Sequence, residues 1–335
     1  MKNPLISILI PFKNTAEFLP ECMQSIINQS YTNWELLIID DGSTDDSYNF
    51  VEQLTTKDSR IQLFKNDGKG IICALRLAFN KSKGELITRM DSDDIMYPNK
   101  LEVLSTNLIK SGKKHVAIGL VKYFSENGIG DGYSKYEEWI NHLTKKGSNY
   151  SEIYKECVIP SPCWMIHRED LIDANAFNPN RYPEDYDLTF RFYEKGYECI
   201  PCSNVLHKWR DYITRASRTD PHYSHYSLLD IKLHYFLKLD YDNPRPLTLW
   251  GAGDKGKTIA KTLIKKEIHF HWICDNPKKI GHDIYGQELL EFNYLKQIKN
   301  PQSIITVANT EAQKQIRTYL EKLELQSMED YFFFC

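Results

Sequence analysis

Two acidic clusters in the first hundred residues could bind a cation, because each follows directly on a strand-like apolar run. Asp40 and Asp41 follow Glu35–Ile39, and the second cluster is Met90-Asp-Ser-Asp-Asp94. Crowded carboxylates repel one another, whereas a hard divalent ion takes oxygen ligands and also binds phosphate oxygens. The second cluster therefore predicts a metal and diphosphate site, for which a solvated acidic turn is the alternative. Its candidate ligands are Asp91, Asp93 and Asp94.

A glycine-rich loop near residue 250 could bind a nucleotide. A strand-like run from Leu247 is followed by Gly251-x-Gly253-x-x-Gly256 and an apolar helix, and the next strand-like run ends at Asp275. Such glycines let a diphosphate approach a helix N-terminus, and an acid at that distance suits a ribose contact. A tight βα turn in a domain that scaffolds or oligomerises is the alternative. We favour the alternative, because the domain is short and its pattern weakens over residues 276–300.

The elements that must position the acidic clusters alternate in type along the chain. Apolar runs predict buried parallel strands at residues 5–10, 35–39, 61–65 and 85–90. Helical periodicity predicts helices at residues 17–28, 45–54, 70–80 and 98–110. This alternation indicates a doubly wound, mostly parallel α/β sheet, in which ligands bind beyond the carboxyl ends of the strands. Both acidic clusters should therefore lie at one edge of the sheet.

Residues 115–124 predict a further strand, and the alternation of strand and helix ends after it. Residues 125–160 are rich in Gly, Tyr, Lys and Ser, and we expect an insertion with some helix around an acceptor site. Residues 240–246 (DYDNPRP) combine turn and breaker residues and form the best linker candidate. The predicted domains are residues 1–240, which carry the acidic clusters, and residues 241–335, a small Rossmann-like α/β domain.

Composition excludes several classes of protein. The formal net charge of −3 gives no basic field, so we expect no nucleic-acid partner. The apolar run at residues 5–11 is too short for a signal peptide and no run is long enough to span a bilayer, which predicts a cytoplasmic protein. Peripheral contact with the inner face of the membrane through Tyr331–Cys335 (YFFFC) is an alternative to a final buried strand there. The eight scattered cysteines fit a reducing compartment, and Cys199-x-x-Cys202 has no second pair with which to form a zinc site.

Several ordered blocks over about residues 4–215 resemble the family 2 glycosyltransferases, which have the nucleotide-diphospho-sugar fold called GT-A. The resemblance implies an inverting transferase that moves a hexosyl or N-acetylhexosaminyl unit from a UDP-sugar, with Mn²⁺ or Mg²⁺ as cofactor. It also implies a glycan or lipid-linked acceptor in surface polysaccharide synthesis. The matching blocks are Ile8–Asn14 (ILIPFKN), Gln29–Asp45 (QSYTNWELLIIDDGSTD), Gly84–Asp94 (GELITRMDSDD), Tyr97-Pro98 and Pro183–Arg191 (PEDYDLTFR).

The resemblance assigns donor-binding roles to matching positions. Pro11 and Asp41 match residues that contact the nucleotide base, with Asp40 beside them. Asp93 matches a residue near the ribose, and either Asp93 or Asp94 matches a metal ligand on the diphosphate, in the motif that Asp91 opens.

Asp185 matches the general base of the family. Inverting transfer needs one carboxylate to take the proton of the acceptor hydroxyl as its oxygen attacks the anomeric carbon, and it needs no protein nucleophile. Glu184 and Asp185 also suit the cap and first turn of a helix, where the helix dipole favours acidic residues. Both roles can hold together.

Further residues could contribute to the site. Lys13 stands where many relatives carry an aromatic residue and could instead meet phosphate. Arg76 could bind diphosphate or lie exposed, and Arg89 could pair with a carboxylate of the acidic cluster. His207 and Arg210 match a strand that often supplies phosphate or acceptor contacts, and His207 is either a third metal ligand or a buried, satisfied histidine.

Other functions fit the sequence less well. A sugar nucleotidyltransferase would carry a glycine-rich basic loop after its first strand, which Pro11–Asn14 (PFKN) lacks. An NAD(P)-dependent oxidoreductase would need a full-length cofactor domain and a catalytic Tyr/Lys or Cys/His set. A non-catalytic sugar-nucleotide-binding protein is the remaining alternative.

Overall fold

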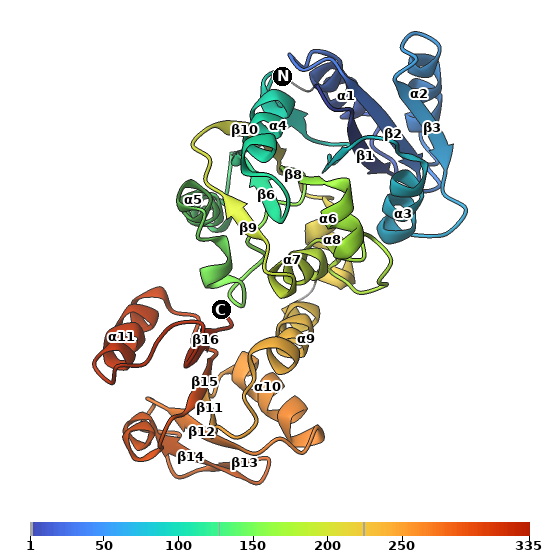
Figure 1. Ribbon diagram of the computed structural model, residues 1–335. Helices are drawn as coiled ribbons and strands as arrows, with labels where there is room; N and C mark the ends of the chain where they lie inside the picture. Colours follow the sequence, from blue (N-terminus) through green and yellow to red (C-terminus); the bar gives the residue numbers. More distant parts are fainter. Residues whose placement is uncertain (1–2, 127, 224) are drawn as a thin grey trace. The chain divides into compact units, whose positions relative to one another are not determined.

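The computed structural model describes residues 3–126, 128–223 and 225–335, and within these ranges the chain forms two compact units. The first unit runs to Asn149 and resumes from Val158 to Thr219, and the second consists of Tyr150–Cys157 and Asp220–Cys335 (Figure 1). Residues 220–240, which the sequence assigned to the first domain, therefore belong to the second unit, as does a short segment from the predicted insertion.

The main sheet of the first unit has seven strands in the order β3-β2-β1-β4-β8-β6-β9. The four predicted strands are present and pair in parallel, which confirms the doubly wound α/β class. β8 pairs antiparallel with both β4 and β6, and it was not predicted. The strands are β1 (Ile6–Phe12), β2 (Trp34–Asp40), β3 (Ile61–Lys65), β4 (Leu86–Arg89), β6 (His115–Ile118), β8 (Trp164–His167) and β9 (Glu198–Ile200).

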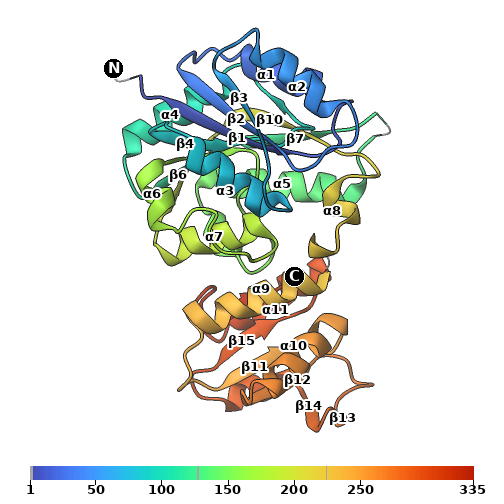
Figure 2. The same cartoon turned by 90° about the vertical axis from the view of Figure 1, so that its right-hand side faces the viewer.

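Helices cover both faces of this sheet, because β1 and β2 carry apolar residues on both of their faces. Alternate residues of β1, such as Ile8 and Ile10, share one core with α1 and α4, while α3 packs on the opposite side (Figure 2). The helices are α1 (Leu19–Ile27), α2 (Ser47–Thr55), α3 (Ile71–Lys81), α4 (Lys100–Ser111), α6 (Arg168–Asp173) and α7 (Glu184–Glu194).

A second, three-stranded sheet lies across the carboxyl end of β4 and has the order β5-β10-β7. It consists of β5 (Ile95–Met96), β10 (Val205–Arg210) and β7 (Leu120–Phe124), and the helix α5 (Asp131–Lys146) packs beside β7. The sequence predicted one strand over residues 115–124, but the chain passes between the two sheets at Gly119. A Cβ atom there would lie 2.7 Å from Leu206 Cδ1 and 2.8 Å from Cys163 Sγ, so a larger residue would not fit.

The second unit has a six-stranded sheet in the order β13-β14-β12-β11-β15-β16, which is parallel except for β13. Its strands are β11 (Leu247–Trp250), β12 (Phe270–Cys274), β13 (Asp283–Ile284), β14 (Gln287–Glu291), β15 (Gln302–Ile305) and β16 (Tyr331–Phe333). Its helices include α9 (His225–Tyr235), α10 (Asp254–Lys265) and α11 (Thr310–Glu321). The aromatic residues at the end of the chain thus form a buried strand. No helix among the described residues is long and apolar enough to cross a membrane.

Residues 150–157 are built into the core of the second unit. The ring of Tyr154 is buried and stacks on Phe334 at 5.4 Å between centroids, and its hydroxyl bonds Asp240. The buried ammonium of Lys232 donates to the backbone oxygen of Lys155 at 2.7 Å. A fragment cut at residue 241 would therefore lose part of its own core.

The glycine-rich loop of the second unit joins β11 to α10, and backbone packing explains two of its three glycines. Gly251 has a φ of +116°, which L side chains rarely adopt. A Cβ atom on Gly256 would lie 2.0 Å from the Gly251 carbonyl oxygen, whereas nothing lies within 4 Å of the Cβ position of Gly253. Gly251 and Gly256 are thus needed for the close strand-to-helix turn itself.

We expect Gly256→Ala to lower the melting temperature, because α10 must move away from β11, at a cost of about 1–3 kcal/mol. Gly253→Ala is the matched control and should unfold like the wild type in the same thermal scan. Equal melting temperatures for all three proteins would show that the loop is not tightly packed.

Candidate active site

The acidic clusters meet at the carboxyl edge of the main sheet, as the sequence predicted. β1 lies between β2 and β4, and its register pairs Phe12 with Asp40 on one side and Leu9 with Arg89 on the other. The Met90 amide continues the ladder by donating to the Leu9 carbonyl oxygen at 3.0 Å. Asp91 and Asp40 therefore lie at the same edge of the sheet, with only β1 between their strands.

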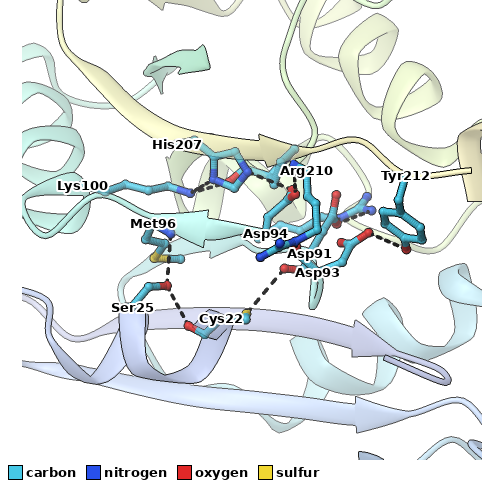
Figure 3. Close-up of polar contacts among 12 residues, drawn as sticks. Cys22, Ser25, Asp91, Asp93, Asp94, Met96, Lys100, His207, Arg210 and Tyr212 are labelled. Carbon is cyan, nitrogen blue, oxygen red and sulfur yellow. Dashed lines mark hydrogen bonds and ion pairs between the residues drawn. The ribbon is translucent and has the colours of Figure 1, made fainter. Parts of the chain in front are cut away.

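Asp94 is fully buried and both of its carboxylate oxygens accept hydrogen bonds (Figure 3). Oδ2 lies 2.9 Å from Nε2 of His207, and Oδ1 accepts from the Arg210 amide at 2.7 Å. The other ring nitrogen of His207, Nδ1, lies 3.3 Å from the buried ammonium of Lys100, which also donates to the Pro162 carbonyl oxygen. An ammonium only donates hydrogen bonds, so Nδ1 of His207 must be the acceptor. Nε2 therefore carries the ring proton and donates its hydrogen bond to Asp94. The result is a buried chain from Lys100 through His207 to Asp94.

Burial sets the protonation of this chain. It lowers the pKa of His207 well below its ordinary value, which fits a neutral ring. Burial also raises the pKa of Asp94, although the Arg215 cation and the Arg210 amide favour its charged form.

Asp91 and Asp93 are the carboxylates that remain partly exposed. Asp93 Oδ2 accepts from the Tyr212 hydroxyl at 2.9 Å, and Asp91 Oδ1 accepts from the Arg89 guanidinium at 3.0 Å. The second oxygen of each accepts no hydrogen bond from the described residues. Burial, and then the neighbouring carboxylates Asp94 and Asp91, raise the pKa of Asp93 to about 7.

Asp91 and Asp93 each have one oxygen atom available for a divalent cation, whereas both oxygens of Asp94 already accept hydrogen bonds. Among the described residues no three His, Cys, Asp or Glu side chains are arranged to hold a metal ion, and Asp94 and His207 are paired with each other. Asp91 and Asp93 each offer one oxygen atom. Phosphate and water oxygens would supply the remaining ligands, as they do at many magnesium sites. Asp94 and His207 support the acidic loop through their bond to each other and through the Arg210 amide, and their assignment as metal ligands stays a prediction.

Two of the basic residues singled out in the sequence contact the acidic loop. Arg210 donates from Nε to the Asp93 backbone oxygen at 2.7 Å and pairs with Glu21. Arg89 pairs with Asp91, as expected, and also with Glu184. Lys13 is exposed next to Phe12 at the end of β1.

Arg76 bonds the loop that precedes α7. Its guanidinium donates to the backbone oxygens of Phe177 and Asn178 and to the Asn180 side chain, at 2.7 to 3.0 Å. Arg76 therefore holds the loop that precedes α7, and diphosphate binding by this residue stays a prediction.

The proposed base contacts lie at the edge formed by β1 and β2. Pro11 is buried in β1, and Asp40 accepts from the Ser43 amide at 2.9 Å. Asp41 accepts from the Asn66 side chain at 2.6 Å and from the Gly70 amide at 3.0 Å. Asp41 thus shapes the loop over residues 66–70 at this edge.

Glu184 and Asp185 form the first turn of α7, as the cap pattern predicted, but their environments differ. The Glu184 carboxylate is buried and bonds Arg89 Nη1 at 2.9 Å. Asp185 is partly exposed, and its Oδ1 accepts from the Tyr186 amide at 2.8 Å. Burial, and then the Glu184 carboxylate, raise the pKa of Asp185 to about 7, while the Arg89 cation lowers it. A carboxylate with this pKa is suited to accept a proton near neutral pH.

Sequence reasoning missed three residues of the site, namely Lys100, Tyr212 and Arg215. Arg215 is buried beside Asp94, Tyr123 and Asp93, and its cation lies 5.1 Å from the Trp209 ring centroid. A lysine at the start of a helix is usually solvated, so no sequence signal separates Lys100 from an ordinary surface residue.

The glycine loop of the second unit lies at the carboxyl end of its sheet. Asp275 is exposed and follows β12 directly, beside the loop that contains Gly253. The Lys279 ammonium donates to the Ala252 carbonyl oxygen at 2.8 Å, which occupies this cation with the loop itself.

Removing the Asp94 side chain should destabilise the protein, because it leaves the buried Lys100 and His207 pair without its anion. We expect Asp94→Ala to lose about 3–5 kcal/mol of unfolding free energy, and Asp93→Asn, at the partly exposed neighbour, to lose much less. Denaturant unfolding of the two variants measures the difference. A stable Asp94→Ala protein would show that the buried chain is not a structural requirement.

Comparison with solved structures supports the fold. Staphylococcus aureus TarS in complex with UDP-GlcNAc matches with a TM-score of 0.53 and 16% identity, over 77% of this chain and 71% of TarS. The mannosyltransferase PcManGT from Pyrobaculum calidifontis, in complex with GDP-Man and Mn²⁺, matches with a TM-score of 0.53 and 16% identity, over 71% of this chain and 64% of that one.

Comparison with known sequences places the chain in a family. Glycosyltransferase GlyG of Streptococcus pneumoniae is 26% identical over 225 residues, which cover 65% of this chain and 74% of GlyG. The Escherichia coli protein WfgD, a UDP-Glc:α-D-GlcNAc-diphosphoundecaprenol β-1,3-glucosyltransferase, is 29% identical over 222 residues, which cover 63% of this chain and 78% of WfgD. Residues 7–174, just over half of the chain, match the family described as glycosyl transferase family 2. The acidic loop, the sheet that carries it and this match agree, and the chain belongs to glycosyltransferase family 2.

Proposed function

We propose that this chain is an inverting transferase that moves a hexosyl or N-acetylhexosaminyl unit from a UDP-sugar to a glycan or lipid-linked acceptor in surface polysaccharide synthesis. The carrying observation is Asp185, a partly exposed carboxylate with a raised pKa at the start of α7, close enough to Asp91 and Arg89 for their charges to act on it. The donor assignment is supported by WfgD, whose name specifies UDP-Glc, and by the TarS complex with UDP-GlcNAc. A lipid-linked acceptor would place the reaction at the inner face of the membrane.

In this proposal Asp185 takes the proton of the acceptor hydroxyl. The acceptor oxygen forms a bond to the anomeric carbon, and the bond from that carbon to the diphosphate breaks, with its electron pair leaving on the diphosphate oxygen. The attack comes from the face opposite the leaving group, so the configuration inverts. Glu184 is held by Arg89, and Asp187 is held by Arg191 at 2.8 Å, which leaves Asp185 as the available base.

Asp91 and Asp93 would hold Mn²⁺ or Mg²⁺, which supplies positive charge to the departing diphosphate. Arg210 and Arg215 add fixed positive charge around the same loop. We assign Pro11, Asp40 and Asp41 to the base of the donor, with Asp93 near its ribose. Membership of the transferase family argues against a nucleotidyltransferase or a purely binding protein.

For the second unit we propose a scaffold. Packing already accounts for Gly251 and Gly256, and the Lys279 ammonium is bonded to the loop. If the loop instead bound a nucleotide, Gly253→Val would abolish a calorimetric titration of the full chain with NAD or NADP that Asp93→Ala leaves intact.

A panel of sugar nucleotides tests the donor and the cation together. We expect UDP-glucose or UDP-GlcNAc to raise the melting temperature only when Mn²⁺ is present, and Asp93→Asn to remove this shift because one of two carboxylate ligands is lost. UDP release should stop in EDTA. Full activity in EDTA would contradict the cation assignment, and a shift with GDP-mannose alone would contradict the donor.

Asp185→Asn keeps the shape of the side chain and removes its ability to accept a proton. Turnover should fall by about 10²–10⁴-fold, while the KM for the donor changes little. In the wild type the base must be ionised, so kcat should fall about tenfold per pH unit below the pKa of about 7. Wild-type turnover in Asp185→Asn would exclude Asp185 as the base.

A further inference from the structure

We propose that Arg89 is a positioning residue for sugar transfer, which joins the acidic donor loop to the first turn of α7 and so fixes Asp185 relative to the donor. The inference rests on the proposed function. It adds a physical link between two parts of the site that are far apart in the sequence.

The link is a buried fork with one carboxylate on each side. Nη1 of Arg89 donates to Glu184 Oε1 at 2.9 Å, while Nη2 and Nε donate to Asp91 Oδ1 at 3.0 and 3.2 Å. The side chains of Arg89 and Glu184 are each only 5% exposed. A guanidinium can serve two carboxylates at once because its donors point in fixed directions, which an ammonium cannot reproduce.

Arg89 is well placed to transmit position, because its backbone belongs to a central strand. It is the last residue of β4, and its partner in the register is Leu9 of β1. Asp91 follows it by two residues in the acidic loop. Glu184 lies ninety-five residues further along the chain and begins α7. The helix start is thus tied to a central strand of the sheet.

A second arginine holds the loop that leads into α7. Arg76, on α3, bonds the backbone of residues 177 and 178 and the side chain of Asn180. Arg76 thus restrains the approach to the helix, whereas Arg89 restrains its first residue and also contacts the donor loop. Removing Arg76 should therefore loosen only the loop before α7, whereas removing Arg89 should also break the contact between α7 and the acidic loop.

The fork also sets the charge next to Asp185. Glu184 on the same helix raises the pKa of Asp185, as Asp91 of the acidic loop does, and Arg89 on β4 lowers it. Removing the cation should therefore raise this pKa, and removing the Glu184 charge should lower it. Removing an arginine that only stabilised the fold would leave the pKa of Asp185 unchanged.

The test is the pH dependence of kcat for UDP release from UDP-glucose and UDP-GlcNAc with Mn²⁺. Arg89→Gln should lower kcat by about 10²-fold, the loss expected for a misplaced catalytic group. It should also move the acid limb of the profile, the pH range in which kcat falls as the base is protonated, to higher pH. Arg89→Lys keeps the charge but loses the fork, so kcat should fall while the limb stays in place. Glu184→Gln should move the limb to lower pH.

Arg168→Gln is the matched control. Arg168 bonds the Gly84 carbonyl oxygen and Ser82 Oγ near the opposite end of β4, at 2.6 and 2.7 Å, so its loss should reduce stability without moving the limb. A wild-type kcat and limb in Arg89→Gln would overturn the proposal, as would limbs that coincide in Arg89→Gln, Glu184→Gln and the control. If Arg89→Gln does not fold, the other two variants decide. A wild-type kcat in Arg89→Lys, or an unmoved acid limb in Glu184→Gln, would then overturn the proposal.

Asp185→Asn, measured in parallel, separates this proposal from the one on which it rests. Wild-type turnover in Asp185→Asn would remove the base assignment itself. An inactive Asp185→Asn together with an unaltered Arg89→Gln would remove only the link through Arg89.

Discussion

Three carboxylates lie within four residues at the edge of a sheet, and the structure around them is arranged to carry their charge. Asp94 is satisfied from beneath by His207 and by the Arg210 amide, and Lys100 supports His207 in turn. A buried anion without such partners would cost several kcal/mol. This pairing requires β10 to lie across the end of β4, which is the role of the small sheet β5-β10-β7. Asp91 and Asp93 can then remain partly exposed with one oxygen each available for a ligand.

The same requirement connects the acidic loop to the first turn of α7. The Arg89 guanidinium pairs with Asp91 and also with Glu184. The first residue of α7 is therefore held by the same cation that pairs with the acidic loop. Asp185 gains a partly desolvated position next to a fixed charge pair as a consequence. The ion pairs that compensate the charges of Asp91 and Glu184 thus also hold Asp185 in position, and both pairs are made by one residue of β4, Arg89.

The second unit follows a different constraint, the close approach of a strand and a helix. Gly251 turns with a positive φ, and Gly256 allows α10 to pass directly over the Gly251 carbonyl. A glycine-rich loop of this spacing is typical of dinucleotide sites, yet the packing of β11 against α10 already requires two of its glycines. The segment over residues 150–157 closes the core of this unit from a distant part of the sequence.

The sequence by itself determined the four parallel strands β1 to β4 of the first sheet and the place of its acidic edge, because apolar runs and helical stripes are local patterns that report burial directly. It also determined the first turn of α7, where Glu184 and Asp185 meet the helix dipole. Only the tertiary structure decided which carboxylates stay available: Asp93 and Asp94 are adjacent and alike in sequence, but the pairing of β10 with β5 brings His207 to Asp94 alone. The division of residues 115–124 between two sheets, the burial of Lys100 and the capture of residues 150–157 likewise depend on contacts between residues far apart in the chain. Such contacts leave no local periodicity, so the physical reason for each appears only when the chain is folded.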